Sequence, residues 1–157
     1  MSGRVPGFPA KREMPVNPRF FLDTNVFVYS FDTRSAPKRD KALVLIERAL
    51  AEGMGFISTQ VVQEFLNVAS RRFEKPLSAR EGELYLDQVL LPLCEVFPSP
   101  DLYRSALRLQ EESGIGFYDA LIVASALEGK GGVLYSEDFQ DKRRFSNLVV
   151  QDPFRSG

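Results

Sequence analysis

Residues 19–25 have the sequence RFFLDTN, an apolar run that ends at Asp23. A short continuous apolar run of this kind is typical of a strand that is buried on both faces of a sheet. Similar runs recur at residues 55–58, 94–97, 133–135 and 148–150. The sequence therefore predicts five strands spread over the whole length of the chain.

Between these strands, apolar residues recur at helical spacing. The predicted helices cover residues 37–52, 59–73, 78–91, 101–112 and 117–128. Ser58 is the expected N-cap of the second helix, and Ser78, with Glu81 three residues later, is the expected cap of the third. Strands that alternate with helices indicate an α/β fold, here a three-layer α/β/α sandwich with a mainly parallel sheet.

We interpret residues 19–154 as one domain and the proline-rich residues 1–18 as a flexible N-terminal extension. The extension is basic but has no apolar core, so it does not resemble a secretory signal. No segment approaches the ~20 consecutive apolar residues of a membrane span. Together with the single thiol, Cys94, these features predict a protein of the reducing cytoplasm.

The composition excludes several kinds of chemistry. The chain has no histidine and one cysteine among 157 residues, so it can build no Ser-His-Asp triad, no internal disulfide and no Cys/His zinc site. Its net charge of −1 is not the bulk positive charge of a non-specific nucleic-acid binder. Acid–base or metal chemistry must therefore use carboxylates, Lys, Tyr or hydroxyl groups.

Four acids fall where an α/β protein places its ligands, beyond the carboxyl ends of the strands or beside an inward helix face. These are Asp23, Glu64, Asp119 and Asp138. Taken singly, each has a structural explanation, such as a helix cap, a turn or an exposed helix edge. Taken together on one rim they would repel one another, and a bound divalent cation would remove that repulsion. Ligation by oxygen alone suits Mg²⁺ or Mn²⁺.

The segments FFLDTNVFVYSFD, ISTQVVQEFLNV, GIGFYDALIVASAL and GGVLYSEDFQ, in this order and spacing, resemble the four motifs of the PIN-domain nucleases. The VapC-type toxins of toxin–antitoxin pairs are the most similar branch. The resemblance implies a parallel sheet with an acidic metal site at its rim, formed by the same four acids. It implies that Asn25 orients the Asp23 loop or a metal-bound water, and that Ser136 supports the fourth acid. Asp141 stands near a position where this branch often has histidine, and is a possible outer carboxylate.

The resemblance further implies a Mg²⁺-dependent endoribonuclease, in which Mn²⁺ can substitute and tRNA or rRNA is the substrate. It implies a cognate antitoxin that inserts a segment into an apolar groove beside the site, for which the helices at 37–52 and 59–73 carry suitable residues, and a homodimer. Two basic clusters are candidates for binding flanking phosphates. They are Arg71, Arg72 and Lys75 after the second helix, and Lys142, Arg143 and Arg144 after the fourth acid.

Two other functions stay open at this stage. The chain could be a non-catalytic PIN-like scaffold that binds RNA or protein, although the presence of all four acids disfavours that function. It could also be a housekeeping RNA-processing nuclease rather than a toxin. A haloacid-dehalogenase-like phosphatase is disfavoured because Asn25 stands where that chemistry needs a second Asp.

Overall fold

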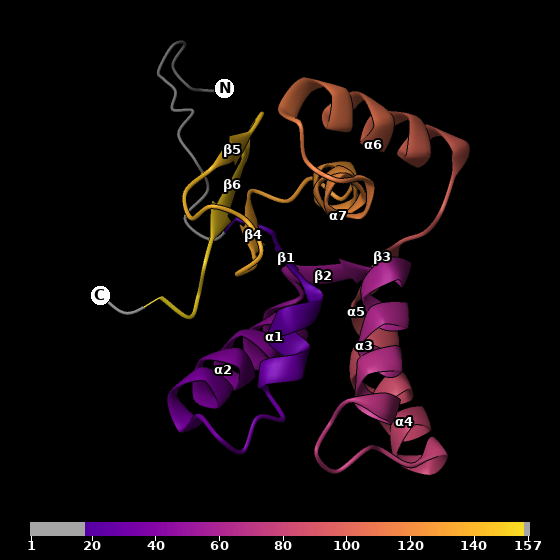
Figure 1. The fold of residues 1–157 in the computed structure, drawn as a ribbon, viewed down its shortest axis with the longest axis vertical. Helices are drawn as coiled ribbons and strands as arrows, with labels where there is room; N and C mark the ends of the chain where they lie inside the picture. The colour runs from indigo at the N-terminus through magenta and orange to yellow at the C-terminus, as the bar shows by residue number, and fades with distance from the viewer. Residues whose placement is uncertain (1–17, 156–157) are drawn as a thin grey trace, which may run out of the picture.

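A six-stranded sheet forms the centre of the fold in the computed structural model, which describes residues 18–155 (Figure 1). The strand order is β3-β2-β1-β4-β6-β5, parallel throughout except for the antiparallel pair β5–β6. The strands are β1 (Phe20–Leu22), β2 (Gly55–Ser58), β3 (Cys94–Val96), β4 (Val133–Tyr135), β5 (Arg144–Phe145) and β6 (Leu148–Gln151). The α/β class and the mainly parallel sheet are confirmed. The predicted extension lies outside the described residues, apart from Pro18.

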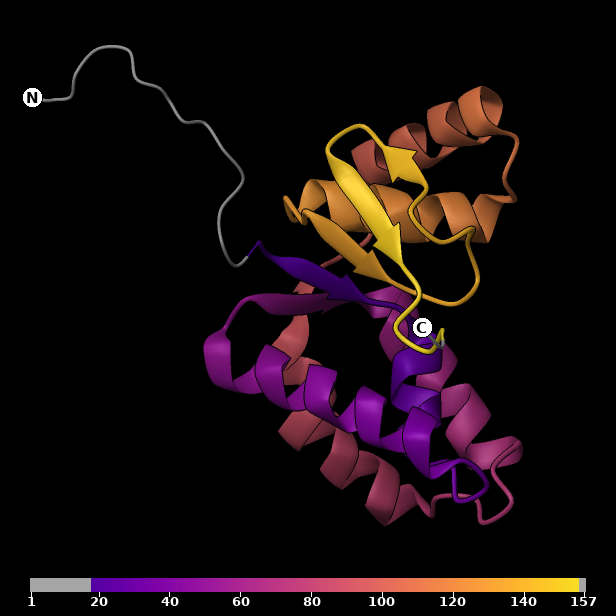
Figure 2. The ribbon, with the colours of Figure 1, turned by 90° about the vertical axis from the view of Figure 1, so that its left-hand side faces the viewer.

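Both faces of the sheet are covered, and neighbouring residues of β2 show how. Successive side chains of a strand point to opposite faces. A Cβ added at Gly55 would clash with Ala49 of α2 (Ala36–Glu52), whereas the ring of Phe56 lies against Gly129, directly after α7 (Phe117–Glu128). Helices α2 and α7 therefore pack on opposite faces, and α6 (Pro100–Ser113) packs on α7, so the predicted layers are present (Figures 1 and 2).

Four of the five predicted helices were placed to within a few residues. Three of them correspond to α2, α6 and α7, and the predicted helix at 59–73 is α3 (Thr59–Arg71), two residues shorter. Ser78 and Glu81 form the expected capping box. Ser58 occupies the N-cap position of α3, but its side chain makes no capping hydrogen bond. The predicted N-cap position is therefore confirmed, without a hydrogen bond to the side chain.

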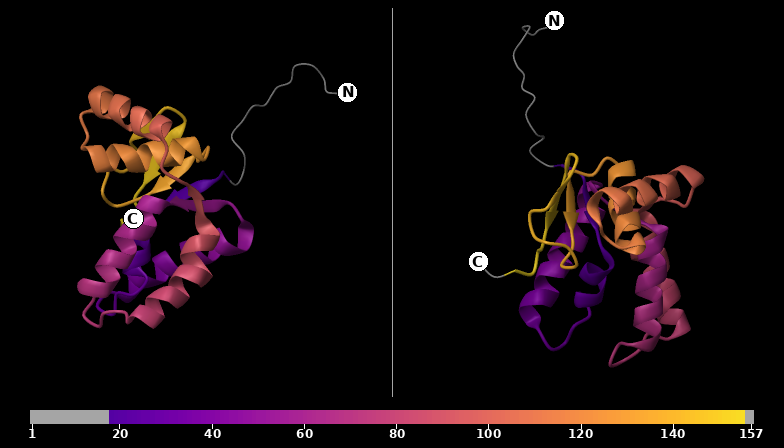
Figure 3. Two further views of the ribbon diagram at one scale, coloured as in Figure 1. Left: turned by 90° about the vertical axis from the view of Figure 1, so that its right-hand side faces the viewer. Right: turned by 45° about the horizontal axis from the view of Figure 1, so that its top comes forward.

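The helix predicted at 78–91 is present but irregular, and it runs without interruption over residues 79–93. The structure has α4 (Ala79–Tyr85), a π-helical turn η1 (Leu86–Leu90) and the short α5 (Leu91–Leu93). Pro92 explains the irregularity, because proline offers no N–H and its ring clashes with the carbonyl four residues earlier. A single π turn inside an α-helix is a rare local disruption of the regular hydrogen-bond pattern. With α3, these segments form an arm that points away from the sheet (Figures 1 and 3).

Two elements were not predicted: α1 (Thr24–Tyr29), directly after β1, and the two-residue strand β5. Helix α1 buries Val26 and Phe27 in the core, although β-branched and aromatic residues have low helix propensity. No helix among residues 18–155 has both the length and the apolar character needed to cross a membrane.

Candidate active site

The topology brings Asp23 and Asp138 together. β1 lies between β2 and β4, so the chain builds the sheet on one side of β1 and then on the other. Ligands bind beside the point where the strand order reverses in this way. Leu22 and Tyr135 are partners in the β1–β4 register, and the Asp23 N–H donates to the Tyr135 carbonyl at 3.0 Å. Asp23 and the segment that carries Asp138 therefore leave the sheet side by side.

Asp23 is the buried acid of the site, with 4% of its surface exposed. It caps α1, because the Thr24 N–H donates to its Oδ1 at 2.7 Å. The Ser136 hydroxyl donates to its Oδ2 at 2.7 Å. Burial nevertheless raises the pKa of Asp23 to about 7; the two hydrogen bonds oppose the rise, and the negative charges of Asp138 and Glu64 add to it. A carboxylate held at this position needs positive charge nearby to stay ionised.

Asn25 and Ser136 connect Asp23 with Asp138. The Asn25 Nδ2 donates to Asp138 Oδ2 at 3.2 Å and to Ser136 Oγ at 3.4 Å. Ser136 Oγ also accepts from the Asp138 backbone N–H at 3.0 Å. The other amide atom, Asn25 Oδ1, is buried without a hydrogen-bond partner. Ser136 therefore donates to Asp23. Asn25 donates to Asp138, whereas the sequence predicts that it orients the Asp23 loop or a metal-bound water.

Glu64 reaches the site from α3 and is held by two residues that the sequence analysis did not select. Thr24 Oγ1 donates to Glu64 Oε1 at 2.6 Å, and Gln60 Nε2 donates to Glu64 Oε2 at 2.9 Å. Gln60 also donates to the Tyr118 carbonyl at 3.2 Å and so ties α3 to α7. The signal was available, since Thr24 lies inside the LDTN motif and Gln60 stands one helical turn before the acid.

Asp119 lies in the first turn of α7 and is exposed. Partial burial raises its pKa, and the negative charges of Asp138 and Glu64 raise it further. Because Asp138 and Glu64 act on both Asp23 and Asp119, the four predicted acids form one electrostatic cluster. No salt bridge joins any of them to a Lys or Arg of residues 18–155.

The donor chemistry of this cluster suits a divalent cation. It offers carboxylate oxygens and the unpartnered Asn25 Oδ1, which are the ligands of hard ions such as Mg²⁺. Within the described range, however, no three acidic or thiol side chains already lie close enough to share one ion. Both oxygens of Glu64 accept hydrogen bonds, from Thr24 and from Gln60, which fix the carboxylate at the edge of the cluster.

Comparison with known families gives a direct assignment. The family described as PIN domain matches residues 20–146, which include all four acids. The chain belongs to the PIN domain family. Comparison of the sequence with curated proteins finds no match.

Solved structures share this PIN fold at low sequence identity. A toxin–antitoxin complex from Klebsiella pneumoniae has a TM-score of 0.63 and 19% identity, covering 87% of this chain and 98% of that one. FitAcB from Neisseria gonorrhoeae has a TM-score of 0.59 and 18% identity, covering 87% and 99%. The sarcin–ricin loop cleaving toxin VapC20 from Mycobacterium tuberculosis has a TM-score of 0.54 and 20% identity, covering 77% and 91%.

The basic residues predicted to bind RNA fall into two groups on this PIN domain. Arg71, Arg72 and Lys75 are exposed, and Arg71 lies seven residues after Glu64, about 10 Å along the helix axis. Lys142 and Arg144 are exposed too, but Arg143 has structural contacts. Its guanidinium donates to the Ser113 carbonyl at 3.2 Å and lies 4.8 Å from the Phe145 ring centroid.

Asp141 does not join the acids of the PIN site. Its Oδ1 accepts from the Asp152 backbone N–H at 2.8 Å, and its Oδ2 lies 3.7 Å from Arg155. It therefore anchors the C-terminal segment, so the prediction of an outer carboxylate at this position is wrong.

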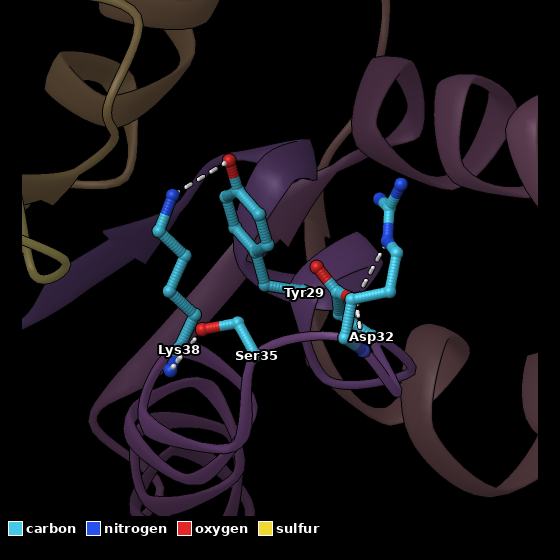
Figure 4. A network of polar contacts seen from close by, with 5 residues as sticks. Tyr29, Asp32, Ser35 and Lys38 are labelled. Carbon is cyan, nitrogen blue, oxygen red and sulfur yellow. Dashed lines mark hydrogen bonds and ion pairs between the residues drawn. The ribbon is translucent and has the colours of Figure 1, made fainter.

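Tyr29 of α1 holds the segment that carries Asp138 through a hydrogen bond to the neighbouring Glu137. Its hydroxyl donates to Glu137 Oε2 at 2.7 Å, and its ring packs edge-on against Phe154. Lys38 reaches the same hydroxyl at 3.4 Å (Figure 4). Burial and the bond to Glu137 raise the pKa of Tyr29. The contact joins α1 to the residue that precedes Asp138, so it stabilises the position of the fourth acid.

Proposed function

We propose that this PIN domain is a divalent-metal-dependent endoribonuclease that hydrolyses phosphodiester bonds in RNA. The observation that carries the proposal is the cluster around buried Asp23, in which the negative charges of Glu64 and Asp138 add to the raised pKa values of Asp23 and Asp119. None of the four acids forms a salt bridge with the described basic residues. Such a cluster is costly for a purely structural purpose and matches the needs of phosphoryl-transfer chemistry.

Asp23, Glu64, Asp119 and Asp138 would hold the ion, which is Mg²⁺ with Mn²⁺ as a substitute. When bound, such an ion lowers the pKa of water and neutralises charge on the scissile phosphate. The chain itself contributes positioning. Ser136 and the Thr24 N–H fix the two oxygens of Asp23, while Asn25 and Thr24 orient Asp138 and Glu64. Exposed Arg71, Arg72 and Lys75 can neutralise phosphates beside the acids.

We further propose that the chain acts as the toxin of a toxin–antitoxin pair and forms a homodimer. Support comes from its likeness to toxin–antitoxin complexes and from exposed apolar side chains on α2, where Leu43, Val44 and Leu50 are each at least 40% exposed. These side chains offer an apolar surface to an antitoxin segment. The substrate class is proposed from the same likeness, since VapC20 is described as a sarcin–ricin loop cleaving toxin. A cytoplasmic location remains a prediction.

Cleavage of total RNA and of tRNA by the purified chain tests the nuclease. We expect cuts that require Mg²⁺ or Mn²⁺, disappear in EDTA and disappear in Asp119→Asn, which exchanges an exposed carboxylate for an isosteric amide. The matched control is Asp87→Asn, since Asp87 is an exposed helical residue outside the cluster.

Metal-dependent cleavage that persists in Asp119→Asn would contradict the assignment. If the folded, inhibitor-free protein neither cleaves nor binds Mn²⁺ through its carboxylates, the chain is a scaffold. Growth arrest on expression, reversed by a protein encoded beside it, would separate a toxin from a housekeeping nuclease.

A further inference from the structure

A cavity of about 350 Å³ lies where the start of α3 meets α6 and α7. Its volume falls within the range of small-molecule sites, about 300–1,000 Å³. The cavity adjoins the acid cluster through two of its lining residues. Gln60 donates to both Glu64 and the Tyr118 carbonyl, and Tyr118 immediately precedes Asp119.

Two of the residues that line this cavity each have a buried polar atom without a hydrogen-bond partner. These atoms are Ser58 Oγ and Gln60 Oε1, in residues that are 2% and 8% exposed. The orientation of the Gln60 amide is fixed by its partners, because a carboxylate and a carbonyl can both only accept. Gln60 therefore presents an unsatisfied acceptor, and Ser58 a hydroxyl that can accept or donate. Buried polar groups in native proteins nearly always have partners, so these two atoms keep hydrogen-bonding capacity for a ligand.

Aromatic side chains also line the cavity. Tyr118 is 69% exposed and packs edge-on against Phe117, with ring centroids 5.4 Å apart. Tyr103 comes from α6 and is also exposed. Exposed rings beside buried hydrogen-bonding groups are the combination with which proteins bind unstacked RNA bases, by stacking on the flat face and hydrogen bonding to the edge.

We propose that this cavity is a subsite for one unstacked RNA base next to the cleaved bond. The inference rests on the proposed function for its substrate class. The base stacks on Tyr118 and donates an amino or imino N–H to Gln60 Oε1, while Ser58 pairs with a neighbouring edge atom. Both polar atoms are covered in this conformation, so entry of a base requires rotation of the lining side chains. The subsite contributes base preference to a nuclease whose acids contact only phosphate.

Nucleosides test the subsite apart from the acid cluster, because they carry no phosphate and need no metal. The full ¹⁵N-labelled chain is titrated in EDTA with adenosine, cytidine, uridine and guanosine, and amide resonances are followed by NMR. We expect saturable shifts of the Gln60 side-chain amide and of the backbone around Tyr118, with unequal affinities for the four bases. Tyr118→Ala should weaken binding at least fivefold. Ser58→Ala should weaken it about two- to tenfold without loss of fold.

The matched control is Leu91→Ala, which removes a half-exposed apolar side chain from α5, outside the cavity, and should leave nucleoside affinity unchanged. Absence of saturable shifts with all four nucleosides would overturn the subsite, even if the chain cleaves RNA. Shifts that are insensitive to both Tyr118→Ala and Ser58→Ala would overturn it as well. If Tyr118→Ala instead changes the sedimentation coefficient and no nucleoside binds, the cavity is covered by a second copy of the chain. Failure of cleavage alone would count against the nuclease and not against the cavity.

Discussion

Asp23→Asn should stabilise the metal-free protein at neutral and alkaline pH. The folded state raises the pKa of Asp23 from 3.8 to about 7, chiefly by burial. The folded chain therefore binds this proton more tightly than the unfolded chain does. As pH rises from about 4 to 7, the unfolded state loses the proton first, and the free energy of unfolding falls. Above pH 7 both states are ionised and no further loss occurs.

The size of the effect follows from the same shift. A difference of about three pKa units corresponds to about 4 kcal/mol, at 1.36 kcal/mol per unit. That is a large part of the 5–15 kcal/mol that typically stabilises a domain. Asparagine keeps the side-chain shape and can still accept the Thr24 N–H, but it meets the Ser136 hydroxyl with an amide. The expected gain for Asp23→Asn at pH 8 is therefore at most about 4 kcal/mol and near zero at pH 4.

Urea unfolding followed by far-UV circular dichroism, in EDTA, measures this difference at each pH. Other carboxylates titrate in both proteins, so the difference between variant and wild type isolates Asp23. Asp87→Asn should show no such pH-dependent gain. Saturating Mg²⁺ should reduce the advantage, because the wild type gains about 2.7 kcal/mol when the ion is present at a hundred times its Kd. A variant no more stable than wild type at pH 8, or a gain independent of pH, would refute the reasoning.

Three further variants test the supports of the site and of the sheet. Thr24→Val removes the 2.6 Å hydrogen bond to the acid on α3, and should weaken Mn²⁺ binding roughly tenfold by calorimetry, with recovery in Thr24→Ser. Tyr29→Phe keeps the ring but loses the hydrogen bond to Glu137, and should lower the free energy of unfolding, measured in urea, by about 1–2 kcal/mol. Unchanged stability would mean that this hydrogen bond does not contribute to the stability of the fold. Gly55→Ala should cost about 1–3 kcal/mol because its Cβ would clash with α2, whereas Gly82→Ala, in open space within α4, should gain about 0.5–1 kcal/mol. Equal thermal unfolding shifts for the two alanine variants would contradict the packing argument.

The sequence was sufficient for five of the six strands and for most of the helices, because these depend on local apolar patterns. The ends of two predicted strands drew attention to Asp23 and Asp138. Glu64 and Asp119 were selected from their positions on predicted helices and from the order of the motifs. Helix α1 was missed because its residues have low helix propensity and its stability comes from burial of Val26 and Phe27 in the core. The π turn before Pro92 was not predicted, because the spacing of apolar residues does not distinguish a π turn from a regular turn of an α-helix.

Site contacts between distant segments were harder to predict. Gln60 is ordinary in sequence, and its role appears only when α3 and α7 lie side by side. Arg143 looked like one of three equivalent basic residues, but its neighbour Ser113 is thirty positions earlier in the chain. Asp141 likewise belongs to the C-terminal segment because Asp152 folds back to it. These outcomes depend on tertiary packing and not on local pattern.

The central position of β1 determines when the site can form during synthesis. Asp23 and Glu64 leave the ribosome early, but β1 is completed on its other side only by β4, more than a hundred residues later. Until that strand docks, Asp23 lacks its Ser136 hydrogen bond, and Asn25 lacks the acid that it orients. A nascent chain therefore carries half of an acid cluster and no working site while it is still attached to the translation machinery. For the RNA-cleaving nuclease proposed above, the acid cluster would therefore be complete only late in synthesis.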